Sequence, residues 1–162
     1  MSKEALVCKN LDKSYKKTEV LKGLDLELEK GKIYGLIGRN GAGKTTLLSI
    51  LSGQNPATAG EITLDGVTVW ENQETMERIC FSRELNPMTN SGVSGMKIKE
   101  YFKVASVYMP GWDQELADRL VKLFELDVKK RIIKLSKGML SMVTIIVAMA
   151  SKADYTFMDE PV

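Results

Sequence analysis

One stretch of the sequence decides how the chain folds: Gly38-Arg39-Asn40-Gly41-Ala42-Gly43-Lys44-Thr45-Thr46. It fits the pattern G-x-x-x-x-G-K-[ST], in which glycines let the backbone turn so that its N–H groups point at a phosphate chain. In this pattern Lys44 reaches the β- and γ-phosphates, and Thr45 places its hydroxyl on a magnesium ion. The stretch therefore predicts a phosphate-binding loop over residues 38–46.

The segments on either side of the loop agree with this interpretation. Residues 33–37, Ile-Tyr-Gly-Leu-Ile, form an apolar run that predicts a buried strand, and residues 46–51 predict a helix. The N-terminus of that helix would add its partial positive charge at the phosphates. The alternative is a glycine-rich turn beside a solitary lysine. A chance match in a chain of this length has a probability of roughly one per cent.

The composition is that of one soluble globular domain. The chain has 162 residues, 44% hydrophobic and 27% charged, with a net charge of +2, so overall charge does not favour nucleic acid as a partner. The N-terminus reads Met-Ser-Lys-Glu, so we expect no signal peptide, and the apolar run at 143–150 is too short to span a bilayer. Histidine is absent, which excludes histidine bases and ligands. Cys8 and Cys80 are expected to be reduced and buried.

The first half of the chain alternates apolar and polar residues in short runs. Strands are expected at 5–9, 20–28, 60–66 and 79–81. A polar turn at 11–17 would hold Tyr15. Asp65-Gly66 closes one hairpin, and residues 67–70 can return as the partner strand. The first third of the chain predicts a small meander that leads into the buried strand at 33–37.

The second half favours helices. Residues 86–96 are expected to be a loop, followed by a helix from Ile98 and another that Asp113 caps. Between these helices, Met109, Pro110 and Trp112 form either an exposed apolar surface or ordinary packing. A third helix follows 135–139, and an apolar strand ends at Asp159 and Glu160.

The order of these motifs resembles the ATP-binding subunit of ATP-binding cassette (ABC) transporters. The resemblance covers residues 1–162 and rests on the phosphate loop, Leu135-Ser136-Lys137-Gly138, and Met158-Asp159-Glu160-Pro161. It implies an α/β fold: a P-loop NTPase (RecA-like) core with an N-terminal antiparallel β subdomain and an inserted helical subdomain. The expected division is 1–85 for the β subdomain and P-loop core, 86–140 for the helical subdomain, and 141–162 for the return to the core.

The resemblance assigns roles to single residues. Asp159 matches the Walker B aspartate, which holds magnesium beside Thr45, and Glu160 matches the catalytic base that polarises the attacking water. Tyr15 matches the aromatic residue that stacks on adenine. The alternatives are a surface carboxylate pair at a strand end for the first two, and a turn tyrosine lying on the sheet for the third.

Ser136 and Gly138 match the signature loop. In the family this loop binds the γ-phosphate held by a second subunit, which implies a head-to-tail dimer with two ATP molecules at the interface. The alternative is a serine that only caps a helix.

Three departures from the family pattern stand out. Lys137 and Met139 replace a glycine and a glutamine of the usual signature, a variant that resembles the ATPases of small exporters with separate permeases. Glu84 stands where the family has a glutamine near magnesium, although a slip of one residue would place Arg83 there. The histidine that follows Walker B in the family is missing, so we expect a chain truncated after Walker B.

The resemblance implies an ATPase subunit that uses ATP and Mg²⁺ and pairs with a second ATP-binding subunit. It also implies an integral membrane permease, contacted through residues 86–112, and a cytoplasmic location at the inner face of the cell membrane. Two alternatives stay open: a nucleotide-binding fragment that does not turn over, and a soluble cassette ATPase that acts on ribosomes or DNA. The near-neutral charge and single cassette disfavour the last, so no nucleic acid partner is expected.

Overall fold

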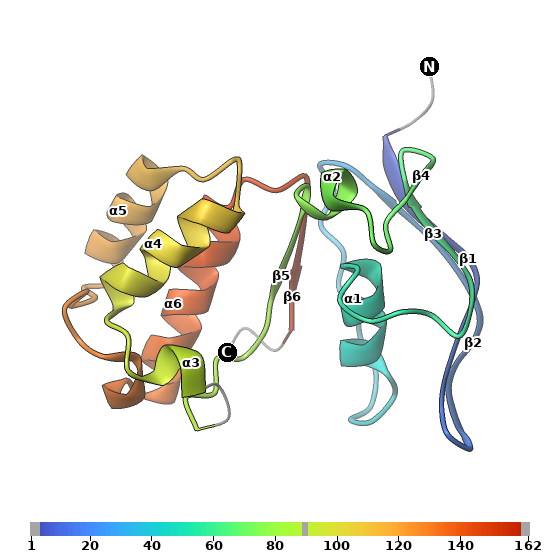
Figure 1. The fold of residues 1–162 in the computed structure, drawn as a ribbon, viewed down its shortest axis with the longest axis horizontal. Coiled ribbons are helices and arrows are strands. Elements are labelled where there is room, and N and C mark those ends of the chain that lie inside the picture. Colours follow the sequence, from blue (N-terminus) through green and yellow to red (C-terminus); the bar gives the residue numbers. More distant parts are fainter. Residues whose placement is uncertain (1–3, 89–90, 160–162) are drawn as a thin grey trace. The chain divides into compact units, whose positions relative to one another are not determined.

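The computed structural model describes residues 4–88 and 91–159 and divides into two units, Met1–Ile79 and Cys80–Val162 (Figure 1). The first unit is built on a four-stranded sheet with the order β2-β1-β3-β4. Its strands are β1 (Ala5–Tyr15), β2 (Thr18–Glu29), β3 (Ala59–Leu64) and β4 (Val67–Thr68). All the pairings are antiparallel, which confirms the predicted antiparallel β subdomain, but β1 lies between β2 and β3, so the strands do not follow one another as the predicted meander would.

The hairpin between β3 and β4 forms where the sequence predicts it. Asp65 and Gly66 both have positive φ, 52° and 83°, as a two-residue hairpin turn requires. Asp65 also accepts hydrogen bonds from the Ala5 amide (2.9 Å) and the Arg78 guanidinium (2.7 Å). The turn is therefore fixed to both ends of the first unit.

Two further expectations for the first unit are wrong. The predicted polar turn at 11–17 is mostly strand, because β1 continues to pair with β2 as far as Tyr15 opposite Thr18. The predicted strand at 33–37 does not form: neither sheet of the described residues takes up this segment, and Ile33 is fully exposed. An apolar run becomes a strand only where a neighbour supplies ladder hydrogen bonds.

Helix α1 (Lys44–Leu51) begins within the phosphate loop, as predicted, and a short α2 (Gln73–Met76) precedes the second unit. Leu47, Ile50 and Leu51 of α1 are buried, which fixes the helix in the first unit through its apolar residues.

The second unit pairs β5 (Ile79–Ser82) with β6 (Tyr155–Met158) and is otherwise helical. Its helices are α3 (Ser91–Ser94), α4 (Ile98–Tyr108), α5 (Gln114–Leu123) and α6 (Lys137–Ala150), with a 3₁₀ turn at Ile132–Lys134. The segment expected to be only loop thus contains α3. One apolar core joins α4, α5 and α6, and includes Ile98, Phe102, Leu120, Val143 and Ile146.

The start of α5 is as predicted, since the Asp113 carboxylate accepts the Leu116 amide at 2.8 Å. Trp112 packs against Phe102 with ring centroids 6.3 Å apart and is partly buried against this core, so ordinary packing describes this residue better than an exposed surface. Among the residues described, none of the helices is long and apolar enough to cross a membrane.

Candidate functional site

The phosphate loop turns twice through backbone conformations that favour glycine. Gly41 and Gly43 have φ of 80° and 89°, and Gly43 caps α1. The first hydrogen bond of the helix runs from the Leu47 amide to the Gly43 carbonyl, at 2.8 Å. The amides of residues 44–46 precede this bond, so their N–H groups have no partner inside the helix and are oriented to receive an anion.

Lys44 lies inside the loop that it would serve. Its ammonium donates to the carbonyl oxygens of Gly38 (2.8 Å) and Arg39 (3.0 Å), and the Ala42 amide closes the turn onto Arg39 at 3.1 Å. Phosphate oxygens carry more negative charge than these carbonyls and would compete with them for the ammonium. The loop therefore holds a cation at its centre, with Thr45 exposed in the first turn of α1.

Tyr15 ends β1 and is 46% exposed. Its hydroxyl accepts a hydrogen bond from the Asn55 amide group at 2.6 Å, and the Lys13 ammonium lies 4.8 Å from the ring centroid. Sequence reasoning missed Lys13 and Asn55. The signal for Lys13 was its position two residues before Tyr15, which places both on one face of a strand.

The predicted signature residues lie at the start of α6 in the second unit. Ser136 caps the helix and its hydroxyl accepts the Met139 amide at 3.3 Å. A Cβ added to Gly138 would meet nothing within 4 Å in this chain. The serine thus caps the helix, as in the alternative interpretation, while the packing within the chain does not require glycine at 138.

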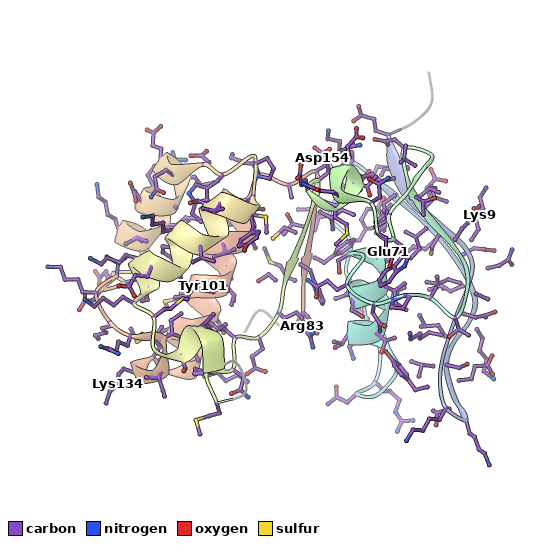
Figure 2. The ribbon with its side chains drawn as sticks, in the orientation of Figure 1. Lys9, Glu71, Arg83, Tyr101, Lys134 and Asp154 are labelled. Carbon is purple, nitrogen blue, oxygen red and sulfur yellow. The ribbon has the colours of Figure 1, made fainter. Side chains whose placement is uncertain are left out.

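Glu84 and Lys137, two of the departures from the family pattern, form an ion pair at 3.7 Å. Arg83, the alternative residue for the Glu84 position, directly follows β5 (Figure 2). Its guanidinium lies 5.7 Å from the centroid of the Phe81 ring. The negative charge of Glu84 is therefore matched by the positive charge of Lys137 at the start of α6.

Asp159 follows β6 and its amide donates to the Ser82 carbonyl at 2.9 Å, so pairing with β5 sets the position of this carboxylate. Glu160, the predicted catalytic base, lies outside the described residues. The first unit thus holds the phosphate loop and Tyr15, and the second holds Glu84, Ser136, Gly138 and Asp159.

The donor types fit the expected cofactors. Thr45, Asp159 and Glu84 offer hydroxyl and carboxylate oxygens, the hard ligands that Mg²⁺ prefers. Within residues 4–88 and 91–159, no three histidine, cysteine or acidic residues gather as a metal site. Mg²⁺ in nucleotide sites commonly has few protein ligands, with phosphate oxygens and water completing the shell.

Comparison with known proteins gives consistent matches. The family model described as "ABC transporter" matches residues 21–162. The ABC transporter ATP-binding protein YtrB of Bacillus subtilis (strain 168) is 29% identical over 94% of this chain and 51% of its own length. The ribose import ATP-binding protein RbsA of Lactococcus lactis subsp. lactis (strain IL1403) is 32% identical over 94% of this chain and 33% of its own length. The chain spans about half of YtrB and about a third of RbsA.

Solved structures show the same fold. An ABC transporter ATP-binding protein from Pyrococcus furiosus aligns with a TM-score of 0.77 and 27% identity, covering 98% of this chain and 76% of that chain. The ATP-binding subunit of an ABC transporter aligns with a TM-score of 0.80 and 24% identity, covering 97% and 66%. These likenesses confirm the predicted P-loop NTPase fold with its antiparallel sheet and its helices.

Proposed function

The chain belongs to the ABC transporter family of ATP-binding proteins, and on that premise we propose that it binds and hydrolyses ATP to power a transporter. The observation that carries this proposal is the phosphate loop, where the Lys44 ammonium lies among loop carbonyls at the N-terminus of α1. A helix N-terminus and an ammonium held by the carbonyls of the loop attract the same ligand, a chain of phosphates.

The proposed roles follow from the chemistry of each side chain. Lys44 binds the β- and γ-phosphates, and Tyr15 stacks on the base. Thr45 and Asp159 would hold Mg²⁺, and Glu84 would be a further ligand. When bound, Mg²⁺ neutralises charge on the β- and γ-phosphate oxygens. Glu160 polarises the attacking water as a general base.

A second ATP-binding subunit is part of the proposal, because nothing in this chain lies close enough to Gly138 to exclude a larger side chain there. Glycine inside a helix costs roughly 0.5–1 kcal/mol relative to alanine. Close approach of a partner's nucleotide to the Ser136–Gly138 backbone would account for it. The subunits would then pair head to tail.

We also propose a separate membrane permease, which would place the chain at the cytoplasmic face of a membrane. Val104, Val107 and Tyr108 lie at i, i+3 and i+4 on α4 and are exposed, while Ile98 and Phe102 face the core. An apolar stripe on the outer face of a helix is typical of a contact surface. Val107→Ser and Tyr108→Ser should reduce co-purification of the permease, with Lys103→Ser as the matched control on the same helix.

The supporting observations disagree on the direction of transport. Lys137 and Met139 in the signature loop support the proposed exporter type. RbsA, by its name, is a ribose import protein. Transport assays in membrane vesicles of both orientations, with the permease present, separate the two.

The central test is MgATP binding measured together with phosphate release. Lys44→Ala should weaken binding by about 10-fold to 100-fold, as expected for the loss of a charged hydrogen-bond donor. Lys32→Ala, an exposed lysine paired with Glu29, should bind as the wild type does. Binding that is equal in all three proteins would refute the role of the loop.

The Glu160→Gln variant distinguishes a hydrolysing subunit from a fragment that only binds nucleotide. It should retain MgATP binding and lower turnover by about 10²-fold to 10⁴-fold, the usual contribution of a general base. Wild-type binding without any phosphate release would favour the non-hydrolysing fragment. Salt-sensitive binding to RNA or DNA would favour the soluble cassette that acts on ribosomes or DNA.

A further inference from the structure

Lys13 is a charged residue in a buried position. Only 7% of it is exposed, and its ammonium donates to the carbonyl oxygen of Pro56 (2.6 Å) and the side-chain oxygen of Asn55 (3.1 Å). The face of the Tyr15 ring, 4.8 Å away at its centroid, completes its surroundings. Burial of an ammonium costs free energy unless its partners are well placed, which suggests that Lys13 has a role beyond packing.

Asn55 connects the two residues. Its side-chain oxygen accepts from Lys13, and its NH₂ group donates to the Tyr15 hydroxyl at 2.6 Å. An amide has one acceptor and two donors on separate atoms, which suits it to bridge an ammonium and a hydroxyl. The rotation and tilt of the Tyr15 ring are thereby set at two points, the hydroxyl and one face.

The loop that carries Asn55 is itself fixed. The Asn55 amide donates to the Ser49 carbonyl of α1 at 3.2 Å. On the strand side, the Thr58 amide donates to the Asp12 carbonyl at 2.8 Å, and the Ser14 amide donates to the Thr58 hydroxyl at 3.0 Å. These bonds lie on either side of Lys13 along β1, so the loop cannot shift without disturbing the strand.

The same helix also begins at the phosphate loop. A Cβ on Gly43 would lie 2.8 Å from Val20, and the next residue of β2, Leu21, pairs with Lys13. The start of helix α1 therefore lies against β2 beside Lys13. The end of the helix accepts the hydrogen bond from the Asn55 amide, in the loop that follows. The proposed phosphate-binding end and the proposed base-binding end of the nucleotide site are thus both in contact with α1.

We propose that Lys13 and Asn55 are positioning residues that fix Tyr15 as the platform for the base of the nucleotide. Because Lys13 covers one face of the ring, the base stacks on the opposite face. A cation against the covered face draws electron density from the ring, which favours stacking on an electron-rich purine. This inference rests on the proposed nucleotide binding and extends it from the phosphates to the base.

The test separates the base from the phosphates by comparing MgATP with inorganic tripolyphosphate, which has no base. Calorimetry on the full chain would measure both ligands. Removal of a stacking side chain typically costs 1–3 kcal/mol, which corresponds to about 5-fold to 150-fold. We expect Lys13→Met and Asn55→Ala to weaken MgATP binding by about 3-fold to 20-fold, with tripolyphosphate binding changed less than about 2-fold.

Two controls exclude a merely structural role. Lys17→Met removes the same charge from an exposed position in the β1–β2 turn and should bind both ligands as the wild type does. In a Tyr15→Ala background, Lys13→Met should have no additional effect on MgATP. Tyr15→Phe, which keeps the ring but loses the bond to Asn55, provides a further test if Lys13→Met does not fold.

Each contrary outcome has a distinct meaning. Equal losses for MgATP and tripolyphosphate in Lys13→Met, or no loss at all, would overturn the positioning role while nucleotide binding stands. Wild-type binding of tripolyphosphate as tight as that of MgATP would show no base contribution and also overturn it. Failure of the wild type to bind either ligand would refute the proposed function itself.

Discussion

Asp113 shows how one side chain makes a helix sensitive to pH. The hydrogen bond from the Leu116 amide is the main cause that lowers the pKa of this carboxyl below 3.8. Burial opposes this effect, and attraction by Lys152 adds to it. A lowered pKa in the folded state means that the charged form stabilises the fold. That contribution is present above pH 3.8 and is lost as the pH falls through the folded-state pKa.

Asp113→Ala should therefore lower the urea midpoint of unfolding at pH 7 and lower it less at pH 3. Asp113→Asn, which still offers an acceptor oxygen, should lie between the wild type and the alanine variant at pH 7. Urea titrations at pH 7, 5 and 3 measure both effects. A deficit for Asp113→Ala that is the same at pH 3 and pH 7 would contradict the assignment.

The Glu84–Lys137 ion pair should contribute little to stability, since its side chains are 55% and 69% exposed. Exposed pairs typically give about 0.2–1 kcal/mol and are screened by salt. A double-mutant cycle of Glu84→Gln and Lys137→Gln should give a coupling energy below about 1 kcal/mol, falling toward zero at high salt. A larger, salt-resistant coupling would indicate a buried contact.

At the scale of elements, the start of α1 depends on two glycines that are required for different reasons. Gly41 and Gly43 both have positive φ, but only Gly43 lies against another segment, with Val20 2.8 Å from an added Cβ. Alanine at either position incurs the cost of the left-handed conformation, roughly 1–2 kcal/mol. Alanine at 43 must also displace Val20, which adds about 1–3 kcal/mol.

Gly43→Ala should thus unfold at lower urea than Gly41→Ala, which serves as its matched control. Chemical denaturation followed by far-UV circular dichroism measures the difference. Equal destabilisation of the two variants would mean that Val20 moves aside without cost.

The two cysteines offer a measurement at the scale of the whole molecule, since one lies in each unit. Cys8 and Cys80 are free and each is 1% exposed, and burial is the main cause that raises the pKa of both thiols. The thiolate is the reactive form, so both thiols should react slowly with a disulfide reagent until their units open.

Cys80→Ala leaves Cys8 to report on the sheet unit, and Cys8→Ala leaves Cys80 to report on the helical unit. Because compact units of one chain can open separately, the two labelling rates should rise at different urea concentrations. Identical profiles would show that the chain unfolds in a single cooperative step.

The sequence predicted most reliably those features that depend on interactions between residues close together in the chain. The phosphate loop, the Asp65-Gly66 hairpin and the Asp113 cap depend on backbone conformations and spacings within a few residues. Glu160 lies outside the described residues, so its role stays a prediction.

Features that depend on distant partners were harder to predict. Tyr15 was expected in a turn, but pairing with β2 extends the strand to that residue. Residues 33–37 have the composition of a buried strand and find no ladder partner among the described residues. Asn55 has no pattern that predicts contact with Tyr15, because that contact is made only when the loop after α1 returns to β1.

The exposed segment at 33–37 has a consequence for handling the protein in solution. It is uncharged, contains no proline and is rich in β-forming residues, and Ile33 and Ile37 are 102% and 96% exposed. Such segments are the sequence signature of cross-β aggregation, and the flanking Lys32 and Arg39 act as charged gatekeepers. Turbidity should therefore rise steeply with protein concentration, and Ile37→Lys should delay its onset. Purification buffers that screen the two gatekeepers with high salt would shorten the storage life of the sample.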